Sequence, residues 1–69
     1  MITLYNCKKS KIERVNGIPS FLVELRGLST DTKPTIWENG IIENGSVYIE
    51  IDTGKVNLYD LETEEWIEV

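Results

Sequence analysis

Residues 46–69 read SVYIEIDTGKVNLYDLETEEWIEV, and this stretch decides how the chain is expected to fold. Apolar and polar side chains alternate along it at period two, which is typical of β-strands. The alternation is interrupted at Thr53-Gly54 and again at residues 61–64. The pattern therefore predicts a three-stranded C-terminal β-meander with two tight turns.

The register of this meander can be predicted from where its apolar residues fall. An even-numbered loop with Thr53-Gly54 at its tip sets Ile49 opposite Leu58, and a loop over residues 61–64 sets Leu58 opposite Ile67. One face is then aliphatic and the other carries an aromatic row in which Tyr48 lies opposite Tyr59. The aliphatic residues are Val47, Ile49, Ile51, Val56, Leu58, Ile67 and Val69, and the aromatic row is Tyr48, Tyr59 and Trp66. We expect the aliphatic face to be buried in the core.

The N-terminal half supplies the cover for that face. Asn16-Gly17 is a strong hairpin signal between strands expected at residues 11–15 and 18–26, with a further strand at residues 2–6. Phe21, Val23 and Leu25 alternate onto one side of the second of these strands and would close the core. Residues 27–45 are rich in turn signals, with short extended pieces expected only at 35–37 and 40–42.

The sequence thus predicts one all-β domain over residues 1–69, either a small antiparallel β-sandwich or a partly open barrel. Its parts are the N-terminal strands and hairpin (1–26), a turn-rich connection (27–45) and the β-meander (46–69). A chain of this length buries only about 60% of its unfolded surface, so the core is thin and contact with further subunits is expected.

Composition excludes several kinds of chemistry. The chain has no histidine, so nucleophiles activated by histidine and the usual histidine-containing zinc sites are absent. It has a single cysteine, Cys7, which cannot form an internal disulfide and is expected to be half-buried. We therefore predict no catalytic residues, no cofactor and no metal, and a protein that is not an enzyme.

Charge is distributed unevenly along the chain. Residues 1–33 carry six basic and three acidic side chains, whereas residues 34–69 carry Lys55 against nine acidic side chains. The basic cluster Lys8-Lys9-Ser10-Lys11 could contact phosphate, but the net charge of -5 argues against direct nucleic-acid binding. Nine carboxylates could instead imitate a phosphate backbone, with Glu62, Glu64 and Glu65 as the candidate contacts.

Aromatic residues give a second set of candidate partner contacts. Trp37, Tyr48, Tyr59 and Trp66 would form a docking surface if they were exposed, because aromatic side chains are enriched at interfaces. Cross-strand packing is the alternative explanation for the same residues.

Several short motifs in the second half of the chain also occur together in a known group of proteins. They are Lys33-Pro34-Thr35, Asn44-Gly45-Ser46, residues 50–56, Tyr59-Asp60 and Trp66, with Asn57 standing where that pattern has an aromatic residue. Over residues 33–69 the chain resembles small virion-associated proteins of tailed bacteriophages and prophages.

The resemblance implies a structural or accessory role, with other phage structural proteins as partners and several copies, or a homo-oligomer, on each particle. It also implies synthesis in the cytoplasm of the host bacterium and a final location in the virion. No apolar stretch is long enough to cross a membrane, so no membrane partner is expected. The alternative is an acidic phage-encoded inhibitor that blocks a host defence nuclease by mimicking nucleic acid.

Overall fold

The computed structural model describes all residues from Met1 to Val69, and every regular element in it is a β-strand. The strands are β1 (Thr3–Lys9), β2 (Ser20–Gly27), β3 (Ile36–Trp37), β4 (Gly40–Ile42), β5 (Val47–Glu50), β6 (Val56–Asp60) and β7 (Glu65–Glu68). The all-β class predicted from the sequence is confirmed.

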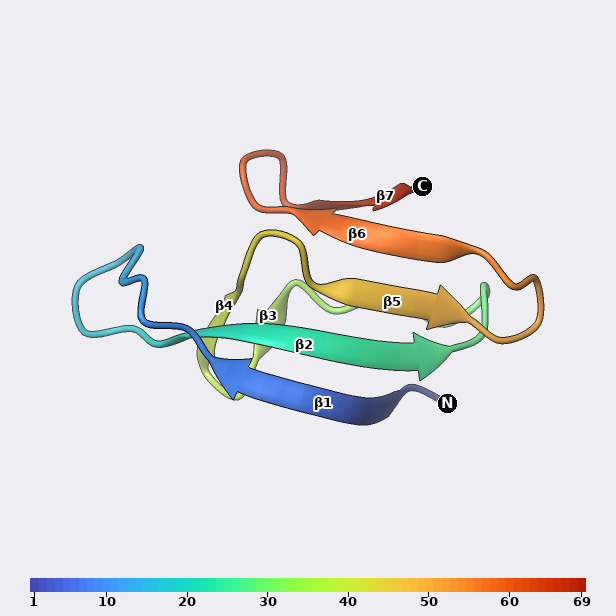
Figure 1. Cartoon of the computed structure of the whole chain (residues 1–69), viewed down its shortest axis with the longest axis horizontal. Coiled ribbons are helices and arrows are strands. Elements are labelled where there is room, and N and C mark those ends of the chain that lie inside the picture. Colours follow the sequence, from blue (N-terminus) through green and yellow to red (C-terminus); the bar gives the residue numbers. More distant parts are fainter.

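The seven strands form one mixed sheet that curls into a half-barrel (Figure 1). Its strand order is β3-β4-β2-β5-β6-β7, with β1 paired to the other side of β2. Strand β2 pairs antiparallel with β1 but parallel with β4 and β5. An antiparallel sandwich is therefore not what the chain forms, and of the two predicted architectures the partly open barrel lies closer.

The parallel seam along β2 is held together by a serine where the ladder is interrupted. Strand β4 pairs with the start of β2 and β5 with its end, so residues 43–46 must bulge between them. Ser46 fills the gap, since its hydroxyl accepts the Val23 N–H at 3.1 Å and donates to the Glu43 carbonyl at 2.8 Å. This buried side chain replaces a missing backbone partner.

The N-terminal hairpin differs from its predicted form. The Asn16-Gly17 turn is present, but only the bridge Val15–Ile18 flanks it, and residues 11–15 are not a strand. The partner of β2 is instead β1, which is longer than predicted and has a bulge between Leu4 and Asn6. Residues 10–19 form a loop in which Arg14 binds Glu43, and β1 occupies the edge of β2 that a strand at residues 11–15 would need.

The pairing of β5 with β6 is offset by two residues from the prediction. Tyr48 lies opposite Asn57, not Tyr59, because the loop runs from Ile51 to Gly54 and is closed by the Glu50 N–H donating to the Lys55 carbonyl at 2.8 Å. A two-residue Thr53-Gly54 turn of the favoured type would need a positive φ at Thr53, which a β-branched residue resists. In the longer loop only Gly54 has a positive φ, of 76°.

The pairing of β6 with β7 places Leu58 opposite Ile67 and Tyr59 opposite Trp66, as the loop over residues 61–64 predicts. The short extended pieces expected in the connection also occur, as the antiparallel pair β3 and β4. Gly40 at the start of β4 is needed there, because a Cβ atom would lie 2.7 Å from the Pro19 carbonyl oxygen and 2.6 Å from the Phe21 ring.

The core lies on the face opposite to the predicted one. Its buried hydrophobic residues are Val23, Leu25, Ile42, Tyr48 and Tyr59, all on the concave side of the sheet. Phe21, Val23 and Leu25 do point into it as predicted, although Phe21 is only partly buried. The two-residue offset keeps each side chain of β5 and β6 on its expected face, since the period of a strand is two. The prediction was wrong only in expecting the aliphatic face, and not the aromatic face, to be buried.

Residues 28–35, which we call the cover segment, close the concave side. The Tyr48 hydroxyl donates to the Leu28 carbonyl at 2.9 Å, and the Trp66 indole N–H donates to the Pro34 carbonyl at 2.8 Å. Lys33 lies over the Tyr48 ring, 4.8 Å from its centroid. The polar atoms of Tyr48 and Trp66 therefore have partners inside the molecule, and aliphatic side chains in their place would leave the Leu28 and Pro34 carbonyls unpaired.

Candidate interaction surface

The outer face of β5, β6 and β7 is aliphatic and uncovered. We call it the outer face and define it by Val47, Ile49, Val56, Leu58, Ile67 and Val69. Val47 and Ile49 are half-buried, but Leu58 is 40% exposed, Ile67 50% and Val69 80%. Ile51, in the loop that follows β5, is 65% exposed. Contiguous exposed aliphatic side chains of this kind typically mark a binding surface.

The outer face is continuous with the outward side of β2. Glu24 is paired with Val47 and Arg26 with Ile49, so the charged residues of β2 border the aliphatic ones of β5. Arg26 forms an ion pair with Glu24 at 3.1 Å, and its guanidinium lies over the Tyr5 ring at 4.0 Å. The surface thus has an aliphatic centre and a charged border on one side, as protein interfaces commonly do.

The predicted aromatic contacts do not form a surface. Tyr48 is fully buried and Tyr59 is 3% exposed, so burial raises the pKa of both phenols. Trp66 packs between them, with ring centroids 5.9 Å from Tyr48 and 5.0 Å from Tyr59. Trp37, on β3, is partly buried against the same core. The condition of exposure is therefore not fulfilled for the two tyrosines, and cross-strand packing, the alternative explanation, describes them.

A polar cluster around Glu50 joins side chains from separate parts of the chain. The Glu50 carboxylate accepts from the Thr53 hydroxyl at 2.7 Å and the Asn57 amide at 3.2 Å, and pairs with Lys33 at 3.2 Å. The Thr53 hydrogen bond, followed by those from Lys33 and Asn57, outweighs desolvation and lowers the pKa of Glu50. Through their contacts with Glu50, Lys33 and Thr53 therefore hold the cover segment and the Ile51–Gly54 loop to the sheet.

A second polar cluster fixes the loop of residues 10–19. Arg14 binds Glu43 through two hydrogen bonds, of 3.0 and 2.7 Å, and Asn44 N–H donates to the same carboxylate at 2.7 Å. The Arg14 contacts are the main reason that the pKa of Glu43 is lowered. Arg14 is thereby occupied, although it lines an open hollow of about 570 Å³ together with Lys8, Lys9 and Lys11.

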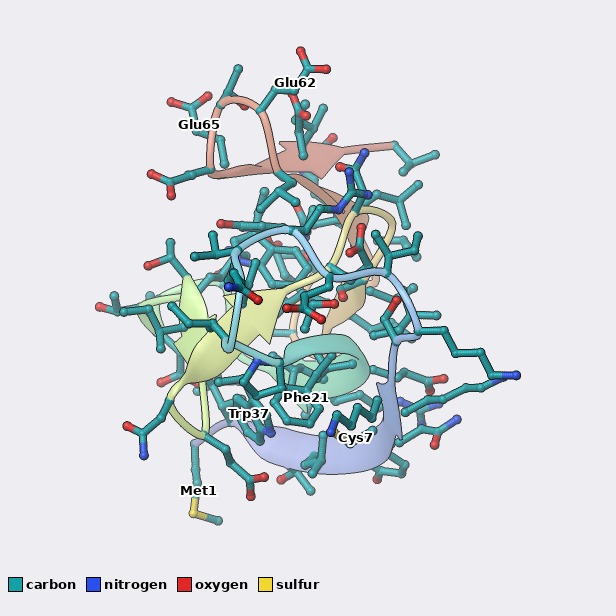
Figure 2. All side chains as sticks on the ribbon, turned by 90° about the vertical axis from the view of Figure 1, so that its left-hand side faces the viewer. Met1, Cys7, Phe21, Trp37, Glu62 and Glu65 are labelled. Atoms are coloured by element: carbon teal, nitrogen blue, oxygen red, sulfur yellow. The ribbon has the colours of Figure 1, made fainter.

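The three predicted acidic contacts lie together and are free. Glu62 and Glu64 lie in the loop between β6 and β7, and Glu65 begins β7. All three are exposed, and none takes part in an ion pair. Figure 2 shows Glu62 and Glu65 at one extreme of the molecule and Cys7, on β1, at the other.

Cys7 is exposed, not half-buried as predicted, because β1 is covered on neither face. Desolvation and the nearby Glu38 raise the pKa of its thiol, so the reactive thiolate is disfavoured. No group of three or more acidic, histidine or cysteine side chains is arranged to hold a metal ion. The fold also has no helix that is long and apolar enough to cross a membrane.

The outer face was missed as a binding surface because the sequence pattern alone does not say which side of a strand is covered. One signal was available: Glu50 and Asn57 share a face with Tyr48 and Tyr59, and polar side chains so placed can bind one another in a core.

Comparison with known proteins identifies no relative: no protein-family model, no curated protein and no solved structure matches this chain.

Proposed function

We propose that the chain is a non-enzymatic structural or accessory protein of a tailed-phage particle, which binds other virion subunits through its outer face. The observation that supports this best is the exposed aliphatic surface of β5, β6 and β7, with Leu58 and Ile67 at its centre. The motif pattern of residues 33–69 supplies the phage context.

The outer face suits assembly better than transient binding of a small ligand. It lies on the convex side of the sheet and not in a pocket, whereas small-molecule sites are concave. A partner sheet or loop that packs there would remove aliphatic surface from water, at about 25 cal/mol per Å² of apolar area. The folded chain would then gain the stability that its small core of five buried hydrophobic residues provides only in part.

The test is incorporation into particles. Particles assembled in cells that express the wild-type chain should contain it at a fixed copy number by quantitative mass spectrometry. The Leu58→Lys/Ile67→Lys variant should be depleted at least about 10-fold, since two charges must then be buried in the contact. The matched control is Thr32→Lys/Thr35→Lys, which adds the same charge at exposed positions of the cover segment. Absence of the wild-type chain, or equal incorporation of the face variant, would refute the proposal.

A second candidate function is inhibition of a host defence nuclease, and the exposed, unpaired Glu62, Glu64 and Glu65 favour it. In this role the acidic loop occupies the basic DNA-binding cleft of the nuclease. The triple change of these residues to lysine should then abolish protection of phage DNA, and raising the salt concentration should weaken protection by the wild type. Unchanged protection by the triple variant would eliminate this candidate.

A further inference from the structure

The two long edges of the sheet are both free. Strand β1 pairs only with β2, and β7 pairs only with β6, so each leaves a row of backbone N–H and C=O groups without a strand partner. Figure 1 shows β1 and β7 at opposite borders of the sheet, running in opposite directions. Such edges accept a further strand from another molecule.

The two edges have opposite charge. Lys8 and Lys9 end β1, and Lys11 follows them, and none of the three takes part in an ion pair. Glu65 begins β7 and is preceded by Glu62 and Glu64, which are equally free. Antiparallel pairing of β7 with β7 over its full length sets Glu65 opposite Glu68, whereas pairing β1 with β7 can set a lysine opposite a glutamate.

We infer that copies of this chain associate head to tail, with β7 of one copy pairing antiparallel with β1 of the next. The inference concerns the isolated chain and goes beyond the proposed function, because it does not depend on a virion partner.

Strand direction and register agree with this arrangement. A continuing sheet sets β7 antiparallel to β1, which brings the Lys8-Lys9 end of β1 to the Glu65 end of β7. With Lys8 opposite Glu65, Lys9 falls opposite Glu64 and Asn6 opposite Ile67. In this register the paired residues lie on the same side of the sheet. Lys8 is on the outward side because it pairs with the exposed Leu22 in its own sheet, and Ile67 is on the outward side because it pairs with the exposed Leu58.

The β1 bulge sets the length of the contact. It lies between Leu4 and Asn6, so the regular part of β1 is the stretch from Asn6 to Lys9, which matches β7 in length. A single edge contact of this size is small, and we expect its affinity to be modest and sensitive to salt. Because the two surfaces differ, each copy can bind two neighbours, and the assembly grows beyond a dimer into a ring or a filament.

Charge-swapped variants test the pairing by sedimentation analysis of the purified chain at increasing concentration. The wild type should exceed the dimer mass in low salt and return toward monomer in high salt. Lys8→Glu/Lys9→Glu and Glu64→Lys/Glu65→Lys should each remain monomeric, and an equimolar mixture of the two should assemble again, because each variant restores the partner that the other lacks. Thr32→Lys, which adds a charge at an exposed position of the cover segment outside both edge strands, should behave as the wild type.

Several results would overturn the inference: a wild type that stays monomeric, a wild type that stops at the dimer, variants that assemble like the wild type, or a mixture that does not assemble. The far-ultraviolet circular dichroism spectrum of each variant should match that of the wild type, because all four substituted side chains are exposed. A wild-type chain that is incorporated into particles but does not self-associate would reject only this inference, and a wild-type chain that self-associates but is not incorporated would reject only the proposed function.

Disulfide trapping supplies an independent readout of the register. In a Cys7→Ser background, Asn6→Cys combined with Ile67→Cys should give a ladder of covalent multimers on a non-reducing gel, because the two positions face each other across the contact. Asn6→Cys alone can give no species larger than a dimer and is the matched control. A double-cysteine chain that yields no more than the control would contradict the proposed pairing.

Discussion

The inner and outer faces of β5, β6 and β7 come from alternate residues of the same stretch of chain. The inner face, which carries polar side chains, is nevertheless buried, and the more hydrophobic outer face is exposed. The inner face holds Tyr48, Glu50, Asn57 and Tyr59, all buried, whereas the outer face holds exposed Leu58 and Ile67. The difference shows that a polar side chain can be buried where partners for it exist, as the cover segment and Thr53 provide here. It also shows that aliphatic residues on a strand need not belong to the monomer core.

Truncation of the largest fully buried side chain of the inner face should have the largest effect. Tyr48→Ala removes a fully buried ring and the hydrogen bond to the Leu28 carbonyl, so we expect a loss of about 3–5 kcal/mol in the free energy of unfolding. A domain of this size has little more stability than that, and urea denaturation should show no cooperative transition. A Tyr48→Ala chain that unfolds near the wild-type midpoint would place the core elsewhere.

Removal of an inner-face hydrogen-bond donor should have an intermediate effect. Asn57→Leu takes away the amide that donates to Glu50 and to the Tyr48 carbonyl, and leaves a mostly buried carboxylate with one partner fewer. We expect a loss of about 1–3 kcal/mol in urea denaturation. The control is the same change in a Glu50→Gln background, where the loss should be smaller because the charge is gone. Equal losses in both backgrounds would mean that the two side chains do not interact.

Acid should weaken the inner polar clusters before it affects the outer face. Hydrogen bonds lower the pKa values of Glu43 and Glu50 in the folded protein, from Arg14 and from Thr53 respectively. Their contribution to stability is therefore complete above the unfolded pKa, about 4.3, and is lost as the pH falls through the lower folded values. Thermal midpoints measured from pH 7 to pH 2 should fall mainly below about pH 4. Midpoints that rise in that range would contradict these shifts.

Substitution on the outer face should have the smallest effect on stability. Leu58→Thr exchanges a 40% exposed leucine for a residue that also favours strands, and we expect a change of less than about 1 kcal/mol. The measurement is urea denaturation at low protein concentration. A loss close to that of Tyr48→Ala would mean that the outer face is covered in the free protein.

The division of side chains between the two faces could be predicted from the sequence, and so could the pairing of Tyr59 with Trp66. Two things could not. The length of the Ile51–Gly54 loop depends on a backbone conformation that Thr53 resists. Because of this longer loop, Tyr48 lies opposite Asn57, two residues from the predicted partner Tyr59. The choice of the buried face depends on the parallel pairing of β2 with β5, a contact between distant residues that no local pattern shows.

The same limits apply to the candidate surfaces. The acidic residues Glu62, Glu64 and Glu65 were identified because charged side chains in a turn are nearly always exposed. Burial of the aromatic residues could not be predicted, because the partners of Tyr48 and Trp66 are the carbonyl groups of Leu28 and Pro34, and a backbone carbonyl has no signature in the sequence. The exposure of the outer face could not be predicted for the same reason, because the opposite face was expected to be exposed.

The parallel seam between β2 and β5 also has a kinetic consequence. The hairpin of β5 and β6 and that of β6 and β7 each join neighbours in the chain, whereas Glu24 meets Val47 only after the whole intervening connection has been brought round. Closing such a loop lowers the conformational entropy of the chain before the contacts that stabilise the seam have formed. We therefore expect the C-terminal hairpins to form early and the seam, with Ser46 at its centre, to close in the rate-limiting step of folding.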